Sequence, residues 1–338
     1  MINRMIDVEE NMNNKIDFVI PWVNGADKTW LEKKKKYDRS TNGDTRVNRY
    51  RDWETLKYWF RGVEKFAPWV NKIYFISDEQ TPDWLNLENK KLVLTDHKDY
   101  IPSKYLPTFS ANPIELNLHR IKDLSEQFVY FNDDFFLLRP ISPAFFFLNK
   151  KPCDDAILSP IIIEGKNTIG KICANDMGVI NTHFTKEEVM HDKRKWLHYK
   201  YGIQMMRTLC LLPWHHLPGF FNDHLPQPFL KETFKTIWEK EGELLDKVCQ
   251  NKFRNYEEDV NQWLMRYWQF CEGNFTPTSP KRGICYTNVC DEALNTIRKQ
   301  SYSVICINDS KEDGFDEWKG KLLGAFESIL PEKSSFEK

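Results

Sequence analysis

The feature that most constrains the fold is an apolar run that ends in three polar residues. Phe128–Phe131 leads directly into Asn132, Asp133 and Asp134. Such a run is typical of a buried strand, and in open α/β sheets ligands bind where strands end. Oxygen ligands of this kind suit Mg²⁺ or Mn²⁺. Taken alone, the triplet is more often an Asx-rich turn that caps the next segment, but its surroundings favour a site. Glu115, His119 and Arg120 stand just upstream.

Strands and helices alternate through the first 140 residues. Strands are expected at Ile16–Ile20, Lys72–Ser77 and Lys91–Thr95, and helices at Arg51–Phe66 and Asn112–Asp123. This alternation predicts a largely parallel sheet with crossover helices. We therefore expect a Rossmann-like α/β fold, although the sequence has no G-x-G-x-x-G motif.

The pattern changes beyond residue 140. Prolines punctuate short segments that predict an inserted β-region, and a helix-rich C-terminal part follows. Helices are expected at Lys186–Cys210, Gln227–Cys249, Glu257–Cys271 and Asp313–Ile329, and a strand at Ser303–Ile307 that delivers Asn308 and Asp309. We divide the chain into a polar extension (1–15), a Rossmann-like part (16–140), an inserted and helical part completing the same domain (141–330), and a charged tail (331–338) that is expected to fray.

Composition excludes several classes of protein. An apolar content of 41% over 338 residues excludes a disordered chain. With 48 basic and 49 acidic residues, no overall field indicates a nucleic-acid partner. The eight cysteines lack zinc-ligand spacing, so we expect small buried thiols in a reducing compartment. No secretory signal or run of about 20 apolar residues is present. These features predict a cytosolic protein, with docking at the inner face of a membrane left open.

Two residues in the second half are candidates for chemistry. His224 lies in a loop with Pro226 and Pro228, just before a predicted helix, and a histidine there can act as an acid or base. A lone histidine is more often a surface or capping residue. Arg254 precedes another predicted helix and could grip a phosphate through two nitrogens, although such arginines are usually solvated ion-pair partners. Glu115 has a similar alternative as a solvated carboxylate on a helix face.

Four blocks of the sequence resemble, in order, those of the Stealth proteins. Departures are Pro21, where Thr or Ser is usual, and Trp53, where a small polar residue is usual. The matching segments are Ile16–Asp27; Arg49–Tyr58 with Ala67–Val70, Leu106–Ser110 through Glu115, His119–Arg120 and Phe131–Asp134; His224–Pro226; and Cys306–Asp309. Stealth proteins include bacterial capsular polysaccharide phosphotransferases and the catalytic part of the animal lysosomal-enzyme N-acetylglucosamine-1-phosphotransferase.

The resemblance implies transfer of a hexose 1-phosphate or N-acetylhexosamine 1-phosphate. The donor would be a UDP-sugar bound by residues 16–140, and the acceptor a hydroxyl of a capsular or cell-wall glycan. The products would be a phosphodiester and UMP. By motif position, Glu115 and Asn132–Asp134 fall on the family's acidic metal and catalytic cluster, His224 on its catalytic histidine, and Arg254 on its active-site arginine.

We expect a direct displacement at the phosphorus bonded to the sugar, with a phospho-histidine as the mechanistic rival. Mg²⁺ or Mn²⁺ would be held by Asn132, Asp133 and Asp134. The remaining residues expected to bind substrate are Trp22, Val23, Asn24 and Gly25 around the uridine, Arg51 on the phosphoryl oxygens with Arg254, and Asp52, His119 and Arg120. Two other functions stay open: a metal-dependent glycosyltransferase that releases UDP, and a non-catalytic glycan-binding protein.

Overall fold

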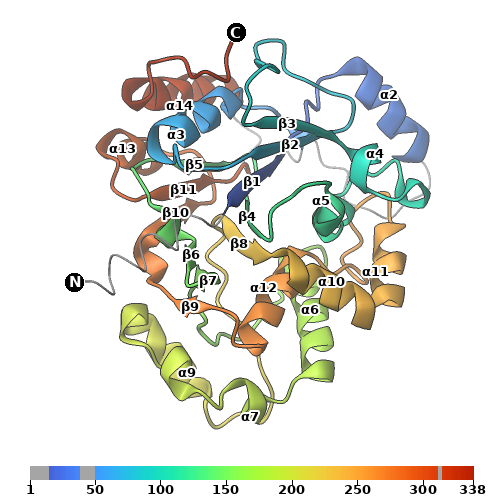
Figure 1. Cartoon of the computed structure of the whole chain (residues 1–338), viewed down its shortest axis with the longest axis vertical. Helices are drawn as coiled ribbons and strands as arrows, with labels where there is room; N and C mark the ends of the chain where they lie inside the picture. Colours follow the sequence, from blue (N-terminus) through green and yellow to red (C-terminus); the bar gives the residue numbers. More distant parts are fainter. Residues whose placement is uncertain (1–14, 39–49, 311–313) are drawn as a thin grey trace.

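A five-stranded sheet of order β3-β2-β1-β4-β8 forms the centre of the molecule (Figure 1). The computed structural model describes residues 15–38, 50–310 and 314–338, so most of the predicted N-terminal extension lies outside it. The first four strands run parallel, and β8 runs antiparallel to β4. The predicted largely parallel α/β fold is therefore confirmed. The strands are β1 (Ile16–Pro21), β2 (Ile73–Ser77), β3 (Leu92–Asp96), β4 (Gln127–Tyr130) and β8 (Gln227–Leu230).

Both faces of β1, β2 and β4 are buried, which explains why these strands are predominantly apolar. Phe18 and Ile20 of β1 face a core shared with α3 (Leu56–Phe66) and α14 (Phe315–Ile329). Val19, on the opposite face, joins a second core. Figure 1 shows α3 and α14 on one side of the sheet, with the elements of the second core on the other.

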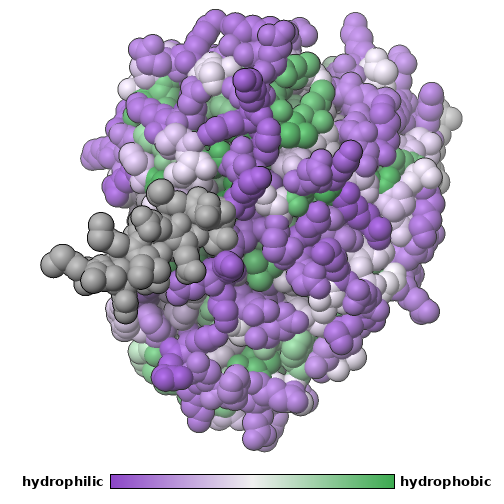
Figure 2. All heavy atoms as spheres, viewed as in Figure 1, coloured by the Kyte–Doolittle hydropathy of each residue, from purple (hydrophilic) through white to green (hydrophobic). Residues whose placement is uncertain are grey.

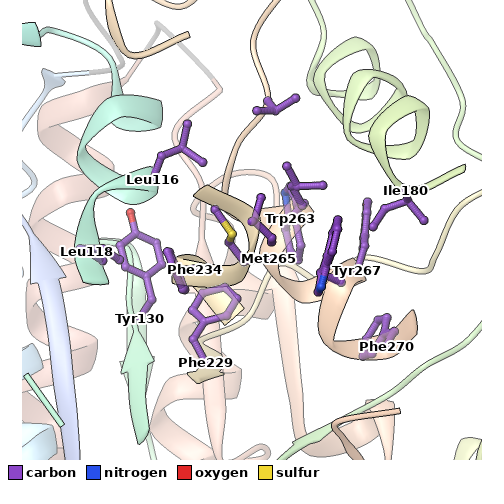
Figure 3. Close-up of a cluster of buried hydrophobic side chains, with 14 of the residues drawn as sticks. Leu116, Leu118, Tyr130, Ile180, Phe229, Phe234, Trp263, Met265, Tyr267 and Phe270 are labelled. Carbon is purple, nitrogen blue, oxygen red and sulfur yellow. The ribbon is translucent and has the colours of Figure 1, made fainter. Parts of the chain in front are cut away.

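The second core is built around α12 (Gln262–Cys271), every residue of which is buried. Its neighbours are α5 (Ala111–Leu116), α6 (Ile169–His183) and α10 (Lys231–Lys240). Figure 3 shows side chains from these helices converging with Tyr130, at the end of β4. This core packs around Tyr130 and so holds the end of β4 in place, just before Asn132–Asp134 begins.

The described residues also form two small sheets, and two strands of one of them, β6 (Phe147–Leu148) and β7 (Lys151–Asp154), lie in the proline-punctuated segment where an inserted β-region was expected. These two strands are joined by β9 (Thr276–Pro277). The other sheet joins β10 (Gly283–Tyr286), β11 (Val304–Ile307) and β5 (Phe135–Leu137). Further elements are α2 (Lys28–Tyr37), α4 (His97–Tyr100), η3 (Ser103–Tyr105), η4 (Leu118–Arg120), η5 (Pro143–Phe145), α7 (Lys186–Val189), α8 (Lys193–Trp196), η6 (Tyr199–Gln204), α9 (Met205–Leu211), α11 (Gly242–Cys249), η7 (Pro280–Arg282) and α13 (Asp291–Lys299).

Several predicted helices are wrong in extent. Residues Gln227–Leu230 form β8 rather than the start of a helix, and Pro228 is tolerated there because β8 is an edge strand. The single helix expected over Lys186–Cys210 is four short elements, with a break at Gly202, whose φ is +55°. The helix α6 was not predicted. The helix expected from Arg51 begins only at Leu56, which leaves Arg51 in a loop.

The C-terminal tail is docked, so the prediction that it frays is wrong. Phe336 is buried, and its carbonyl accepts a hydrogen bond from the backbone of Asn86. The Glu337 carboxylate accepts hydrogen bonds from Nε and Nη2 of Arg61 at 2.8 and 2.9 Å. The tail thereby packs against α3 and closes one side of the first core.

In the view of Figure 2 most of the surface is hydrophilic, and hydrophobic residues form small separate areas. Within the described ranges, no helix is long and apolar enough to cross a membrane.

Candidate active site

The ends of the parallel strands open into a cavity of about 380 Å³. Val19 of β1 lies beside Tyr130 of β4 in the sheet register, so the residues that follow these strands emerge at the same edge. Trp22 and Val23 line the cavity after β1, and Asn132–Asp134 line it after β4. The cavity therefore lies where the sequence predicted a ligand site.

Glu115 reaches this cavity from α5 and is itself buried. The Tyr130 hydroxyl donates to Glu115 Oε1 at 3.1 Å, and the backbone N–H of Gln262 donates to Oε2 at 3.3 Å. Burial raises the pKa of Glu115, while the nearby Arg254 acts in the opposite direction. Glu115 is thus a fixed interior carboxylate rather than a solvated one on a helix face.

The acidic triplet, Asn132–Asp134, carries two carboxylates whose negative charge is only partly balanced by neighbouring protein groups. Asp134 Oδ1 is buried and has no hydrogen-bond partner among the described residues. Asp133 is exposed, but into the cavity. Desolvation there, together with Asp134 and Asp52, raises the pKa of Asp133 to about 7, and burial raises that of Asp134 to about 6.

These observations fit the predicted metal site. Asn132, Asp133 and Asp134 offer the oxygen ligands that Mg²⁺ and Mn²⁺ prefer. A cation beside the pair would satisfy the unpartnered Asp134 oxygen and would favour the ionised form of both carboxyls, whose pKa values are raised without it. Of the described carboxylates, Asp52 also lines the cavity, and its pKa is raised by burial.

His224 enters the cavity from the loop before β8 in an uncommon backbone conformation. Its φ is +49°, in the left-handed region where non-glycine residues are infrequent and often functional. The edge of its ring meets Phe135, with centroids 5.1 Å apart. Burial lowers the pKa of His224, but Cys285, Asp134 and Asp223 together raise it above its ordinary value.

Two thiols hold one nitrogen of this ring. His224 Nδ1 lies 3.3 Å from Cys306 Sγ and 3.8 Å from Cys285 Sγ. The two cysteines are direct neighbours in the register of β10 and β11. The remaining ring nitrogen, Nε2, lies on the opposite edge of the imidazole and is the one that can exchange a proton with a substrate.

Arg254 also lines the cavity, as predicted. Its charge acts on the pKa values of Glu115 and Asp259, and its guanidinium lies 6.0 Å from the centroid of the Tyr256 ring. The loop that carries Arg254 is fixed by Asp259, which accepts hydrogen bonds from the Asn112 and Asn251 side chains. A permanent positive charge is thereby brought to the acidic cavity.

Arg51 also lines the cavity. It was expected to bind the phosphoryl oxygens of the substrate, but here it binds a carboxylate of the protein. Its Nε and Nη2 donate to Asp309 at 2.7 and 2.6 Å, so one edge of its guanidinium is engaged by a carboxylate. Trp53 Nε1 donates to the same carboxylate at 3.1 Å. Asp309, although part of a block noted in the sequence, was not among the predicted site residues.

The four residues expected around the uridine separate into two pairs. Trp22 and Val23 line the cavity. Asn24 instead exchanges hydrogen bonds with the side chain of Gln80. A Cβ atom on Gly25 would lie 2.1 Å from the carbonyl oxygen of Tyr50, so this glycine permits a close backbone approach. Asn24 and Gly25 shape the turn rather than line the cavity.

His119 and Arg120 lie outside the set of described residues that line the cavity. The His119 ring faces Phe234 and Trp238, and burial lowers its pKa to about 3. Arg120 lies over the Trp238 ring at 4.7 Å. The helix ends at Leu116 and η4 follows, which turns these two side chains away from Glu115.

The sequence reasoning missed residues that complete the cavity. Tyr130 was identified as part of a strand, but not as the donor to Glu115. The apolar strand that delivers Asp309 was a usable signal for that residue. Cys285 had no local signal, because only the pairing of β10 with β11 brings it to Cys306.

Comparison with known proteins matches this geometry to one family. Residues 14–41 match the model of Stealth protein conserved region 1, and residues 49–154 match that of conserved region 2. A capsular polysaccharide phosphotransferase, WcwK of Streptococcus pneumoniae, is 44% identical over 331 residues, covering 96% of this chain and 98% of the relative. The receptor polysaccharide phosphotransferase WefC of Streptococcus gordonii is 43% identical over 335 residues, covering 96% of this chain and all of the relative.

A solved structure of the galactosyltransferase LgtC aligns with 91% of this chain and 95% of its own, with a TM-score of 0.39 and 10% identity. That similarity is too low to support a conclusion about activity. The full-length sequence relatives, in contrast, share the order and span of the whole chain. The protein therefore belongs to the Stealth family, together with these polysaccharide phosphotransferases, and is itself a phosphotransferase.

Proposed function

We propose that the protein transfers a sugar 1-phosphate from a UDP-sugar to a hydroxyl of a capsular or cell-wall glycan. The observation that carries this proposal is the meeting of Asp134, His224 and Arg254 in one cavity. Phosphoryl transfer needs these elements: oxygen ligands for a cation, a proton acceptor and a fixed positive charge. Full-length relatives named as capsular or receptor polysaccharide phosphotransferases support the acceptor class.

The proposed reaction is a displacement at the phosphorus that carries the sugar. The oxygen of the acceptor hydroxyl forms the new bond to this phosphorus, and the bond to the oxygen that bridges to UMP breaks. UMP leaves with that electron pair, and a phosphodiester joins sugar and acceptor. His224 Nε2 takes the proton of the hydroxyl and later releases it to solvent.

The surroundings of His224 support its role as the base. For Nε2 to accept a proton, Nδ1 must carry one and donate it, and the sulfurs of Cys306 and Cys285 lie at 3.3 and 3.8 Å from that atom. The Phe135 ring restrains the imidazole from the side. A base positioned in this way contributes roughly 10²–10⁴-fold to the rate.

Charge on the transferring group would be met by Arg254, held near Glu115. Asn132, Asp133 and Asp134 would hold Mg²⁺ or Mn²⁺, which supplies neutralisation of the diphosphate as UMP departs. Glu115, anchored by Tyr130, supplies a carboxylate whose charge interacts with that of Arg254. Arg51 is engaged by Asp309 and organises the wall of the cavity instead of providing the main phosphate contact.

Trp22 and Val23 line the side of the cavity after β1 and are proposed to contact the uridine. The reaction is placed in the cytosol, with the acceptor glycan reached at the inner face of the membrane.

The test is analysis of the nucleotide product. The protein is incubated with Mg²⁺, a panel of UDP-sugars and a capsule-type oligosaccharide, beside the Asp134→Ala and His224→Ala variants. UMP that forms only with acceptor, and is lost in both variants, is the expected result. UDP as the product would replace the proposal with glycosyl transfer.

Glu239→Ala is the matched control, because Glu239 is exposed on α10, outside the cavity. Its UMP formation should equal that of the wild type. Binding of oligosaccharide without any nucleotide product across the panel would favour the glycan-binding alternative.

A further inference from the structure

Three potential ligands for a soft metal lie together beside the acidic triplet. His224, Cys285 and Cys306 each direct one donor atom to a common point, and these atoms lie within 4.8 Å of one another. They come from three segments: the loop before β8, and the neighbouring strands β10 and β11. A cluster of this kind cannot arise from a short sequence motif, so its spacing in the chain gave no sign of it.

The two nitrogen–sulfur separations match those of a tetrahedral zinc site. Zinc binds thiolate at about 2.3 Å and imidazole nitrogen at about 2.0–2.1 Å. Tetrahedral angles then place the sulfur and nitrogen atoms about 3.6 Å apart. The observed separations from His224 Nδ1 are 3.3 Å to Cys306 and 3.8 Å to Cys285, on either side of that value.

A carboxylate lies beside the three donors. The Cys306 thiol donates to Asp134 Oδ2 at 3.6 Å, so a negative charge lies next to the cluster. Other buried thiols have different surroundings: Cys249 lies against the amide of Asn117, and Cys153 against the carbonyl of Ala144. The convergence on one point therefore distinguishes Cys285 and Cys306 from ordinary core cysteines.

We propose that His224, Cys285 and Cys306 form a second metal site, which takes a soft divalent cation such as Zn²⁺. Thiolate and imidazole ligands select such an ion over Mg²⁺, which keeps the all-oxygen triplet. Binding displaces the thiol protons.

Occupation of this site switches the enzyme off, an effect that rests on the proposed function of His224. The metal takes the electron pair of Nδ1, so Nε2 retains its hydrogen and cannot accept one from the acceptor. Zn²⁺ therefore inhibits without displacing either substrate from its contacts.

The test uses Co²⁺ as a spectroscopic probe, so it does not depend on activity. Reduced wild-type protein titrated with Co²⁺ in the presence of Mg²⁺ should develop thiolate-to-metal charge-transfer absorption that saturates at one ion per chain. Excess Zn²⁺ should abolish the absorption. Co²⁺ bound only to Asp133 and Asp134 would give no thiolate band, and that result would overturn the proposal.

Variants identify the ligands. Cys285→Ser and Cys306→Ser should each weaken Co²⁺ binding at least tenfold, because even residues behind the ligands commonly account for about 10–100-fold in metal affinity. Cys285 is only half-buried, so its variant can fold even if that of the buried Cys306 fails. Cys210→Ser is the control, since Cys210 is exposed on α9. Bands unchanged in folded Cys285→Ser would contradict the assignment.

Inhibition is measured separately. Zn²⁺ should suppress UMP formation by the wild type and by Cys210→Ser, and a chelator should restore it. A wild type that shows the thiolate band but forms no UMP with any donor would retain the metal site while contradicting the proposed function.

Discussion

Arg51 and Asp309 form a bidentate ion pair across 258 positions of the sequence, with N–O distances of 2.7 and 2.6 Å. Both residues line the cavity. The pair ties the loop before α3 to the end of β11, while Trp53 adds a third hydrogen bond to the same carboxylate. Two blocks at opposite ends of the chain are thereby locked into one wall of the cavity.

Replacing Asp309 by Ala should lower the free energy of unfolding by about 1–3 kcal/mol, because hydrogen bonds to charged groups are lost in a partly desolvated setting. Urea unfolding measures this change. The control is Glu232→Ala, which breaks the exposed pair with Lys235 and should change stability by less than about 1 kcal/mol. Equal losses in the two variants would show that the Arg51 pair is no stronger than a surface contact.

The acidic triplet should account for stabilisation by Mg²⁺. At 100 times its dissociation constant, a ligand that binds only the folded state adds about 2.7 kcal/mol to stability. Wild type and Glu239→Gln should show this gain as a rise in melting temperature. Asp133→Asn and Asp134→Asn should show little of it, because each loses a charged ligand. An undiminished rise in both variants would place the metal elsewhere.

The role of His224 as a base predicts inversion of configuration at phosphorus when a chiral phosphorothioate donor is used. A single displacement inverts the centre, whereas a phospho-histidine intermediate requires two displacements and retains it. His224→Gln should reduce UMP formation about 10²–10⁴-fold while leaving the Mg²⁺-induced rise in melting temperature in place. Retention in the wild type would establish the covalent route.

Gly25→Ala should destabilise the protein by several kcal/mol, since the added methyl would meet the Tyr50 carbonyl at 2.1 Å. Gly178→Ala is the matched control: Gly178 lies within α6 and has nothing within 4 Å of the added atom. That change should stabilise the helix by about 0.5–1 kcal/mol. Thermal unfolding of the two variants should therefore move in opposite directions.

Docking of the C-terminal tail should depend on pH through Glu337. Burial acts to raise the pKa of this carboxyl, but the Arg61 hydrogen bond and the Ser334 backbone outweigh it and hold the pKa below its ordinary value. A depressed carboxyl pKa contributes stability above the unfolded-state value of about 4.3, and this contribution is lost as the pH falls through the folded-state pKa.

At neutral pH, Glu337→Gln should therefore cost about 1–3 kcal/mol. The difference from wild type should shrink steadily below about pH 4.3. Glu332→Gln is the control, because Glu332 is exposed. A difference that stays constant from neutral to acid pH would mean that Glu337 acts through packing alone.

The sequence predicted the edge of the sheet where the cavity lies, because that prediction depends on apolar runs. Phe128–Phe131 contributes to both cores, so its apolar character is continuous and unambiguous. The strand β8 was missed because it has four residues and is followed directly by α10. The helix was predicted to begin at Gln227 because the helical periodicity of α10 starts directly after these four residues. They are extended because they pair with β4.

Placement of individual side chains was less predictable. The helix expected over Asn112–Asp123 would carry both Glu115 and His119, but it stops at Leu116, and its capping residue, Asn117, bonds back to Pro113. The tail was judged by its charge alone, whereas Arg61 inside α3 supplies its partner. Both errors arise from contacts between segments, which no local pattern records.

The pairing of Arg51 with Asp309 also has a consequence during synthesis. Asp309 follows Arg51 by 258 positions, so a long stretch of chain is translated before Arg51 can meet its counter-ion. A nascent chain, or one ended prematurely upstream of β11, can carry the acidic triplet and His224 while one wall of its cavity stays unlocked. Full catalytic competence should therefore begin only when the last strand has left the ribosome.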